Sequence, residues 1–284
     1  RKGWSDVIVG APYVWLLVFF LLPFLVVVAM SFATKTSTAP PISWGGDHPL
    51  LNWEAYARAL GDGLYLRAFL TSVLNAGVAM VLCLLIGYPM ALGLVRVAPA
   101  WRNILLMLVI LPFWTSFLIR VYAWIGILKK EGLLNLFLMN IGLISEPLTI
   151  MNTPTAVYIG IVYSYLPFMI LPLYASLEKI NPALLEAAAD LGSPPWKSFW
   201  QVTFPLSLPG VLAGCFLVFI PATGEFVIPD LLGGSDTLMI GKTLWGEFFA
   251  NRDWPVSSAV AVVLLLVLVI PIVLFQRSQQ KLRE

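Results

Sequence analysis

Long runs of apolar residues alternate with short polar segments along the whole chain. A helix that spans the hydrocarbon core of a bilayer needs about 20 mostly apolar residues, and six segments meet that requirement. They lie at roughly 9–33, 68–95, 103–127, 153–177, 206–230 and 256–276. The pattern therefore predicts an all-α membrane protein with six transmembrane helices, formed by one domain over residues 1–284.

The composition supports a membrane environment. Hydrophobic residues make up 60% of the chain and charged residues only 11%, whereas soluble domains carry about 25% charged residues. The mean hydropathy is +0.89. The formal net charge of +2 is too small to indicate nucleic acid as a partner. Membrane lipid is therefore the expected surrounding of the chain.

The distribution of basic residues predicts the orientation. Lys and Arg concentrate in cytoplasmic segments near the ends of membrane spans. With the N-terminus inside, more of them fall in the inner segments than in the outer loops, and the inner segments are shorter in total. The outer loops also hold most of the acids. We therefore expect both termini on the cytoplasmic side.

Several classes of chemistry are disfavoured by the residues that the chain carries. There is one histidine, in a polar loop, and no Cys/His/Asp cluster has metal-ligand spacing, so neither a metal site nor a His-based catalytic triad is expected. Cys83 and Cys215 lie inside apolar runs, which favours buried free thiols. The chain also lacks the glycine-rich phosphate loop of an ATPase. We expect no cofactor and no enzyme activity in this subunit.

The longest inner loop, 178–204, has the pattern of a helix–turn–helix. Asn181 suits an N-cap and Pro182 the first helical position, and Ala and Leu residues follow. Gly192 suits the left-handed position just after a helix, before two prolines. A second short helix is expected from Pro195 to Gln201.

Three aromatic residues in that second helix would face the cytosol. They are Trp196, Phe199 and Trp200. Exposed apolar patches of this kind usually mark a protein interface. The alternative is an amphipathic hairpin that lies on the lipid surface.

The same loop resembles the EAA loop of bacterial ABC importer permeases. Its residues Glu186, Ala187 and Ala188 are followed after three residues by Gly192, and then by Val202-Thr-Phe-Pro205. The family's pattern has a branched apolar residue, commonly Ile, and then Leu-Pro at the last positions, so Val202 and Phe204 are conservative departures. The spacing is kept throughout.

The resemblance implies a type I ABC importer permease in the bacterial cytoplasmic (inner) membrane. In that family the loop docks on the ATP-hydrolysing subunit, which implies that Glu186, Ala187, Ala188, Gly192 and Pro205 are the ATPase-coupling residues. It also implies a second permease subunit in a heterodimer, two ATPase subunits that hold ATP and Mg, and a periplasmic substrate-binding protein.

Three further stretches are most similar to polyamine permeases, those for putrescine and spermidine. They are Leu111–Trp124, Gly224–Gly234 and Asn251–Pro255. Importers of amino acids, iron or oxyanions share the EAA loop, so another small solute remains an alternative cargo. A secondary transporter is a further alternative, although the EAA spacing argues against it.

Acidic and aromatic residues in the predicted spans are candidates for the path of a cationic cargo. The candidates are Trp114, Tyr122, Glu225 and Asp230. A charge at mid-bilayer costs roughly 2.5–3.5 kcal/mol on insertion scales, so an acid there usually faces a cavity or a partner. An aromatic face can bind a desolvated ammonium group. Trp114 is the aromatic candidate nearest mid-membrane, whereas Tyr122 is equally consistent with an interfacial anchor.

Arg120 complicates this assignment because it is a cation in the same predicted part of the membrane. Counting 1.5 Å per residue along straight helices puts Arg120 roughly 25 Å and Glu225 roughly 24–28 Å from the inner face. Three interpretations are open. The two residues form a structural ion pair, both extend to the outer interface, or Glu225 attracts the cationic cargo while Arg120 is turned away or neutralised.

Overall fold

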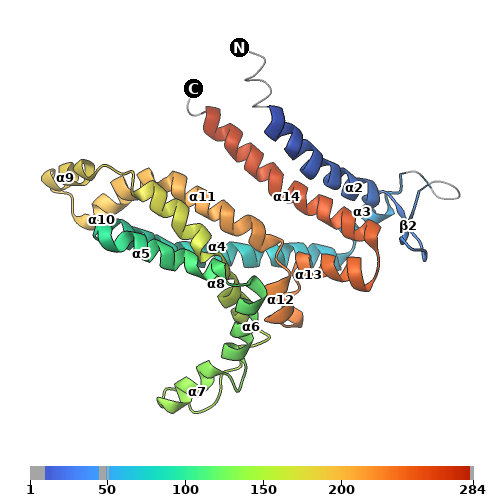
Figure 1. Cartoon of the computed structure of the whole chain (residues 1–284), viewed down its shortest axis with the longest axis horizontal. Coiled ribbons are helices and arrows are strands. Elements are labelled where there is room, and N and C mark those ends of the chain that lie inside the picture. The colour runs from blue at the N-terminus through green and yellow to red at the C-terminus, as the bar shows by residue number, and fades with distance from the viewer. Residues whose placement is uncertain (1–9, 45–48, 50, 282–284) are drawn as a thin grey trace. The chain divides into compact units, whose positions relative to one another are not determined.

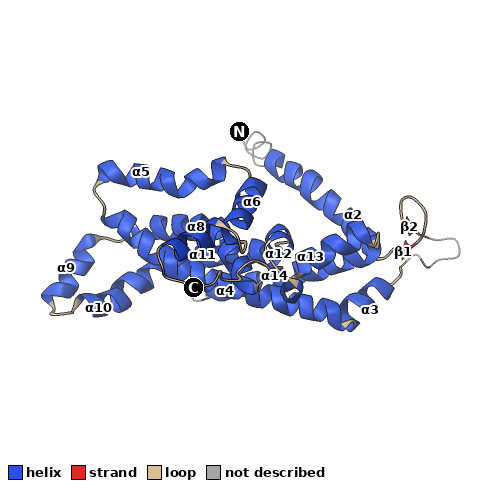
Figure 2. Ribbon diagram, turned by 90° about the horizontal axis from the view of Figure 1, so that it is seen from below, coloured by secondary structure: helices blue, strands red, loops and turns tan. Residues whose placement is uncertain are grey.

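The computed structural model describes residues 10–44, 49 and 51–281. These residues are mostly helical, as Figures 1 and 2 show. The chain divides into two compact units, one of residues 1–69 with 243–284 and one of residues 70–242. Each unit is described by itself.

The first unit joins the two ends of the chain. A helix over Gly10–Ser31 contains a π-helical turn at Leu17–Leu21 and continues as α2, Leu22–Ser31. The antiparallel strands β1 (Thr34–Lys35) and β2 (Ile42–Ser43) follow, and then α3 (Glu54–Gly61). The π-helical turn Gly246–Ala250 leads into α14, Trp254–Lys281, which packs against α2 and α3.

A buried carboxylate connects the start of α14 to the segments that follow α2. The side chain of Asp253 is 2% exposed and accepts hydrogen bonds from Lys35 Nζ and Arg58 Nη1, each at 3.1 Å. Its other oxygen accepts from the backbone N–H of Val256 at 3.3 Å and so caps the helix. Partial burial opposes the charge on Arg58, but the Asp253 carboxylate raises the pKa of the guanidinium above its ordinary value.

The second unit holds most of the remaining helices. They are α4 (Gly63–Arg96, from Leu70 onward), α5 (Pro99–Ile110), a 3-10 turn (Leu111–Trp114), α6 (Phe117–Leu128), α7 (Leu133–Asn140), α8 (Pro154–Leu177), α9 (Pro182–Asp190), α10 (Pro195–Ser198), a π-helical turn (Phe199–Thr203), α11 (Phe204–Thr223), α12 (Val227–Leu231), a 3-10 turn (Ser235–Thr237) and the start of α13 (Ile240–Trp245).

Helices α8 and α11 form the centre of this unit and pack closely along their lengths. Two glycines of α11 permit this approach. A Cβ atom at Gly210 would lie 2.5 Å from Ser176 Cβ and 2.7 Å from the carbonyl oxygen of Pro172, and one at Gly214 would lie 2.7 Å from Met169 Sδ. The Gly-x-x-x-Gly spacing therefore serves helix packing.

Among the described residues, four continuous helices are long and apolar enough to cross a membrane, and they match four of the six predicted spans. They are Gly10–Ser31, Gly63–Arg96, Pro154–Leu177 and Pro195–Thr223. The sixth predicted span corresponds to α14. The third, 103–127, is a bent pair of helices, Pro99–Trp114 and Phe117–Asn140, whose axes differ by 91°.

The bend has a local cause. Pro112 begins a 3-10 turn, and Thr115 and Ser116 then adopt extended backbone angles that separate the two helices. The hydroxyl of Thr115 donates to the carbonyl oxygen of Pro112 at 2.9 Å. Because the segment is not straight, the depth of Arg120 counted at a constant rise per residue does not apply.

The fifth span also ends earlier than predicted. Helix α11 stops at Thr223, and Gly224 follows as its C-cap. Glu225 therefore lies in a turn beyond the helix, and Asp230 lies in the separate short helix α12. Because α11 ends before Glu225, the depth counted for Glu225 along one straight helix does not apply either.

Candidate functional site

A cavity of about 430 Å³ opens in the second unit where α6, α8 and the turn between α11 and α12 meet. Its lining combines aromatic rings with one acid and one base. The lining residues are Phe113, Phe117, Arg120, Ser164, Tyr165, Phe168, Pro221, Gly224, Glu225, Phe226 and Val227.

Glu225 is the acid of this cavity and is held by three hydrogen bonds. Its Oε1 accepts from the backbone N–H groups of Phe226 at 3.0 Å and Val227 at 2.9 Å. Its Oε2 accepts from the hydroxyl of Tyr165 at 2.5 Å. The residue is 8% exposed. Because hydrogen bonds to an ionised group are stronger than neutral ones, this arrangement stabilises a carboxylate at the cavity wall.

Arg120 lies one turn into α6 and rests against aromatic rings. Its guanidinium carbon is 5.3 Å from the centroid of Phe113 and 5.8 Å from that of Phe117. Its Nε is buried without a hydrogen-bond partner among the described residues. Arg120 and Glu225 form no ion pair with each other within the described part of the chain.

The other predicted pathway residues do not line this cavity. Trp114 is 74% exposed and Tyr122 is 58% exposed, and neither belongs to the lining. Asp230 forms an ion pair with Lys242, at 3.2 Å between Oδ1 and Nζ. The structure thus brings Glu225 together with Arg120, and places Trp114, Tyr122 and Asp230 outside the cavity.

Sequence reasoning missed the aromatic residues that hold the two charges. Tyr165 comes from α8, Phe117 precedes Arg120 by three residues on α6, and Phe113 belongs to the 3-10 turn before the bend. The spacing of three residues was a usable signal for the contact between Arg120 and Phe117, whereas the contact with Phe113 depends on the bend. The contact between Tyr165 and Glu225 depends on the packing of α8 against α11, which no local pattern reveals.

The predicted helix–turn–helix is present in the loop after α8. The side chain of Asn181 accepts from the N–H of Ala183 at 3.1 Å and caps α9. Gly192 has a φ angle of +79°, and its N–H donates to the carbonyl of Ala189. These contacts confirm the N-cap and the left-handed glycine. The second helix begins at Pro195 as predicted, but it continues through the π-helical turn into α11 instead of ending at Gln201.

The residues of this loop present an exposed surface. Glu186, Ala187, Gly192 and Pro205 are exposed, and Ala188 is half-buried. Two apolar side chains stand out beside them, Leu191 at 89% exposure and Trp196 at 71%. An apolar side chain with that exposure gains stability only against another surface. This loop, residues 178–204, is the predicted docking loop.

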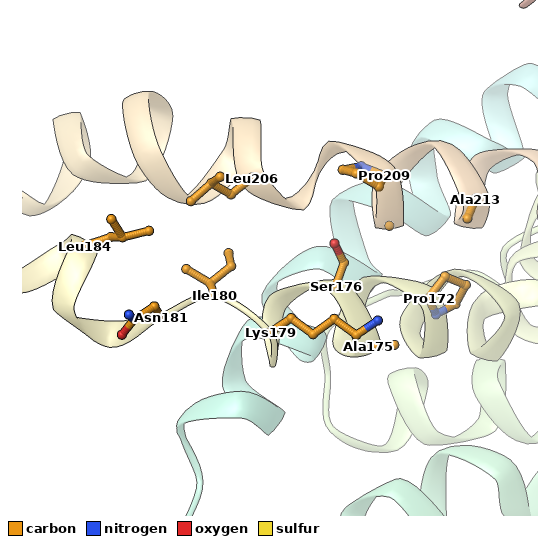
Figure 3. A pocket seen from close by; sticks show the side chains of 11 residues that line it. Pro172, Ala175, Ser176, Lys179, Ile180, Asn181, Leu184, Leu206, Pro209 and Ala213 are labelled. Atoms are coloured by element: carbon orange, nitrogen blue, oxygen red, sulfur yellow. The ribbon is translucent and has the colours of Figure 1, made fainter. Parts of the chain in front are cut away.

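A groove of about 600 Å³ runs beside this loop between α8, α9 and α11. Figure 3 shows Leu184 of α9, Leu206 of α11 and Ile180 of the connecting segment around one end, and Ser176 and Pro209 further along. Its polar lining residues are Ser176, Lys179 and Asn181, and Figure 3 shows the Lys179 side chain extending toward Ala175. The groove thus lies between α9 of the loop and the paired helices α8 and α11.

Comparison with known proteins identifies the family. Residues 83–283 match the family described as binding-protein-dependent transport system inner membrane component. The spermidine/putrescine transport system permease protein PotB of Haemophilus influenzae is 41% identical over 287 aligned residues, covering 100% of this chain and 97% of that protein.

Two solved structures share the fold. A bacterial ABC transporter involved in the import of the acidic polysaccharide alginate aligns with a TM-score of 0.74 and 16% identity, covering 100% of both chains. A bacterial alginate ABC transporter in complex with an alginate pentasaccharide-bound periplasmic protein aligns with a TM-score of 0.71 and 17% identity, covering 97% of this chain and 96% of that one. The matched family and the full-length similarity show that the chain belongs to the binding-protein-dependent transport system inner membrane components, the permease subunits of ABC importers.

Proposed function

We propose that this permease subunit imports polyamines, putrescine or spermidine, across the bacterial inner membrane. The observation that carries the proposal is the carboxylate of Glu225 at the wall of an aromatic cavity within the second unit. The full-length similarity to a spermidine/putrescine permease supports the same cargo.

The chemistry of the cavity suits an alkylammonium group. A polyamine carries positive charges separated by short apolar methylene chains, so it needs a carboxylate for the charge and apolar or aromatic surface for the stem. Glu225 supplies the first, and Phe168, Phe226 and Tyr165 line the same space. An ammonium group over an aromatic face gains up to about 2 kcal/mol when both are desolvated.

The rest of the transport machinery is proposed from the docking loop. We infer that Glu186, Ala187, Ala188, Gly192 and Pro205 couple this chain to a partner ATPase subunit that holds ATP and Mg. A complete importer would contain a second, non-identical permease subunit, two ATPase subunits and a periplasmic binding protein that delivers the cargo. Movement of the ATPases would then be passed through α9 to α8 and α11, which flank the loop.

Uptake of labelled putrescine and spermidine by cells carrying the whole transporter tests this function. We expect Glu225→Gln to abolish most uptake while the complex still assembles, because the amide keeps the size of the side chain and loses its charge. Glu131→Gln, which removes an exposed acid after α6, is the matched control and should transport normally. Normal uptake by Glu225→Gln would remove Glu225 from the pathway, and absence of polyamine uptake in the wild type would refute the cargo.

An oxyanion is the second candidate cargo because Arg120 lines the same cavity. A guanidinium binds oxyanions in a bidentate manner. Competition separates the two candidates: an excess of unlabelled spermidine blocks uptake of a polyamine importer, whereas sulfate or molybdate blocks that of an oxyanion importer.

A further inference from the structure

Two opposite charges line one cavity of the second unit and yet do not form an ion pair. Arg120 and Glu225 are the cation and the carboxylate among the described residues of its lining. Opposite charges attract strongly in surroundings of low dielectric constant. Other groups must therefore hold each charge in the arrangement that the structure shows.

The two charges are held to different degrees. Glu225 accepts three hydrogen bonds, from Tyr165 and from the backbone N–H groups of Phe226 and Val227. Arg120 has the faces of two phenylalanine rings, but its buried Nε finds no acceptor among the described residues. A buried donor without an acceptor carries a desolvation penalty. The position of Arg120 is thus incompletely satisfied, and the carboxylate that could satisfy it lines the same cavity.

Arg120 lies close to the break in the bent span. It lies one turn after Thr115 and Ser116, where the chain turns between the two halves of the bent span. Helix α6 packs against α8, which carries Tyr165, and against α12, which begins two residues after Glu225. A rotation about the bonds of the long arginine side chain would bring the guanidinium toward Glu225. The acceptor sites that it would use are those that an ammonium group of the cargo needs.

We propose that Arg120 is an internal counter-ion that competes with the cationic cargo for Glu225. While an ammonium group binds Glu225, the guanidinium stays on Phe113 and Phe117, whose ring centroids lie 5.3 and 5.8 Å from it. When the cargo leaves, the guanidinium takes its place on the carboxylate. This inference rests on the proposed polyamine function, because only a cationic cargo competes with a guanidinium. In this proposal the two phenylalanine rings stabilise the displaced guanidinium by cation–π contact while the cargo is present.

Equilibrium binding of labelled spermidine to the purified complex of permeases and ATPases tests the competition. We expect Arg120→Gln to lower the Kd roughly tenfold, equivalent to about 1.4 kcal/mol, because the competitor is gone. Arg120→Lys keeps a competing cation and should stay close to the wild type. Lys129→Gln, which removes an exposed charge just after α6, is the matched control and should not change the Kd. An unchanged or raised Kd in Arg120→Gln overturns the proposal.

A second measurement needs no cargo and separates the failure of this inference from the failure of the proposed function. The thermal midpoint of the complex without polyamine is measured for Arg120→Gln, Glu225→Gln and the double variant. Non-additive shifts mean that the two side chains interact directly, and additive shifts overturn the counter-ion role. If the wild type binds no polyamine and the shifts are still non-additive, the cargo assignment fails and the internal ion pair stands.

Discussion

At the scale of single residues, the cavity shows how a charge is kept in an apolar surrounding. Glu225 is the most constrained group of the site, since two of its three donors are backbone N–H groups that a side-chain substitution cannot remove. The third donor, the hydroxyl of Tyr165, comes from another helix and ties α8 to the turn after α11. Tyr165 therefore positions the carboxylate with respect to the cavity.

Replacing Tyr165 by Phe tests that positioning role. The ring remains and the hydroxyl is lost, so Glu225 keeps two of its three hydrogen bonds. A hydrogen bond to a charged group contributes about 1.5–3 kcal/mol, part of which water in the cavity replaces. We expect the KM for polyamine uptake to rise about fivefold to tenfold, with the amount of complex in the membrane unchanged. Tyr163→Phe alters a tyrosine of the same helix that does not line this cavity and should leave KM unchanged. Equal effects of both substitutions would contradict the role of Tyr165.

At the scale of elements, features that depend on residues close together in the sequence could be predicted, whereas those that depend on contacts between distant segments could not. The cap at Asn181 and the turn at Gly192 depend on residues a few positions apart, so the local pattern was sufficient. The span at 103–127 was predicted as one apolar segment, because hydropathy does not register the extended angles of Thr115 and Ser116. The meeting of Tyr165 with Glu225 depends on the contact between α8 and α11, which periodicity alone does not position.

The close packing of α8 and α11 makes Gly210 a sensitive position. A methyl group there would press on Ser176 and on the backbone carbonyl of Pro172, and a backbone atom cannot move aside cheaply. We expect Gly210→Ala to destabilise the subunit by about 1–3 kcal/mol, the range for overpacking, and to lower the thermal midpoint and the expression of the complex. Gly77→Ala is the control, since a Cβ atom there meets nothing within 4 Å. A thermal midpoint as high in Gly210→Ala as in Gly77→Ala would mean that the two helices are not in tight contact.

At the scale of the whole molecule, the proposed function needs a connection between the loop that would bind the ATPase and the cavity that would bind the cargo. The cavity with Glu225 is formed by α6, the middle of α8 and the turn after α11, whereas the predicted docking loop connects the C-terminal end of α8 to the start of α11. The same two helices therefore lead from the docking loop to the cavity. Because Pro195–Thr223 is one continuous helix, we expect a displacement at Trp196 to reach the turn that holds Glu225 through it.

The exposed tip of the docking loop provides the test of that connection. Leu191 is 89% exposed beside Gly192 and contributes little to the fold of the subunit itself. If it seats on an ATPase subunit, Leu191→Asp places a charge in an apolar contact, and we expect the ATPase to be lost from the purified complex and uptake to fall at least tenfold. The permease should remain folded, with an unchanged thermal midpoint of its own. Leu51→Asp introduces the same charge at a leucine that is 62% exposed in the segment before α3, and it should retain both the ATPase and transport. Retention of the ATPase by Leu191→Asp would exclude the loop tip from the coupling surface, since a buried unpaired charge at such a contact costs several kcal/mol.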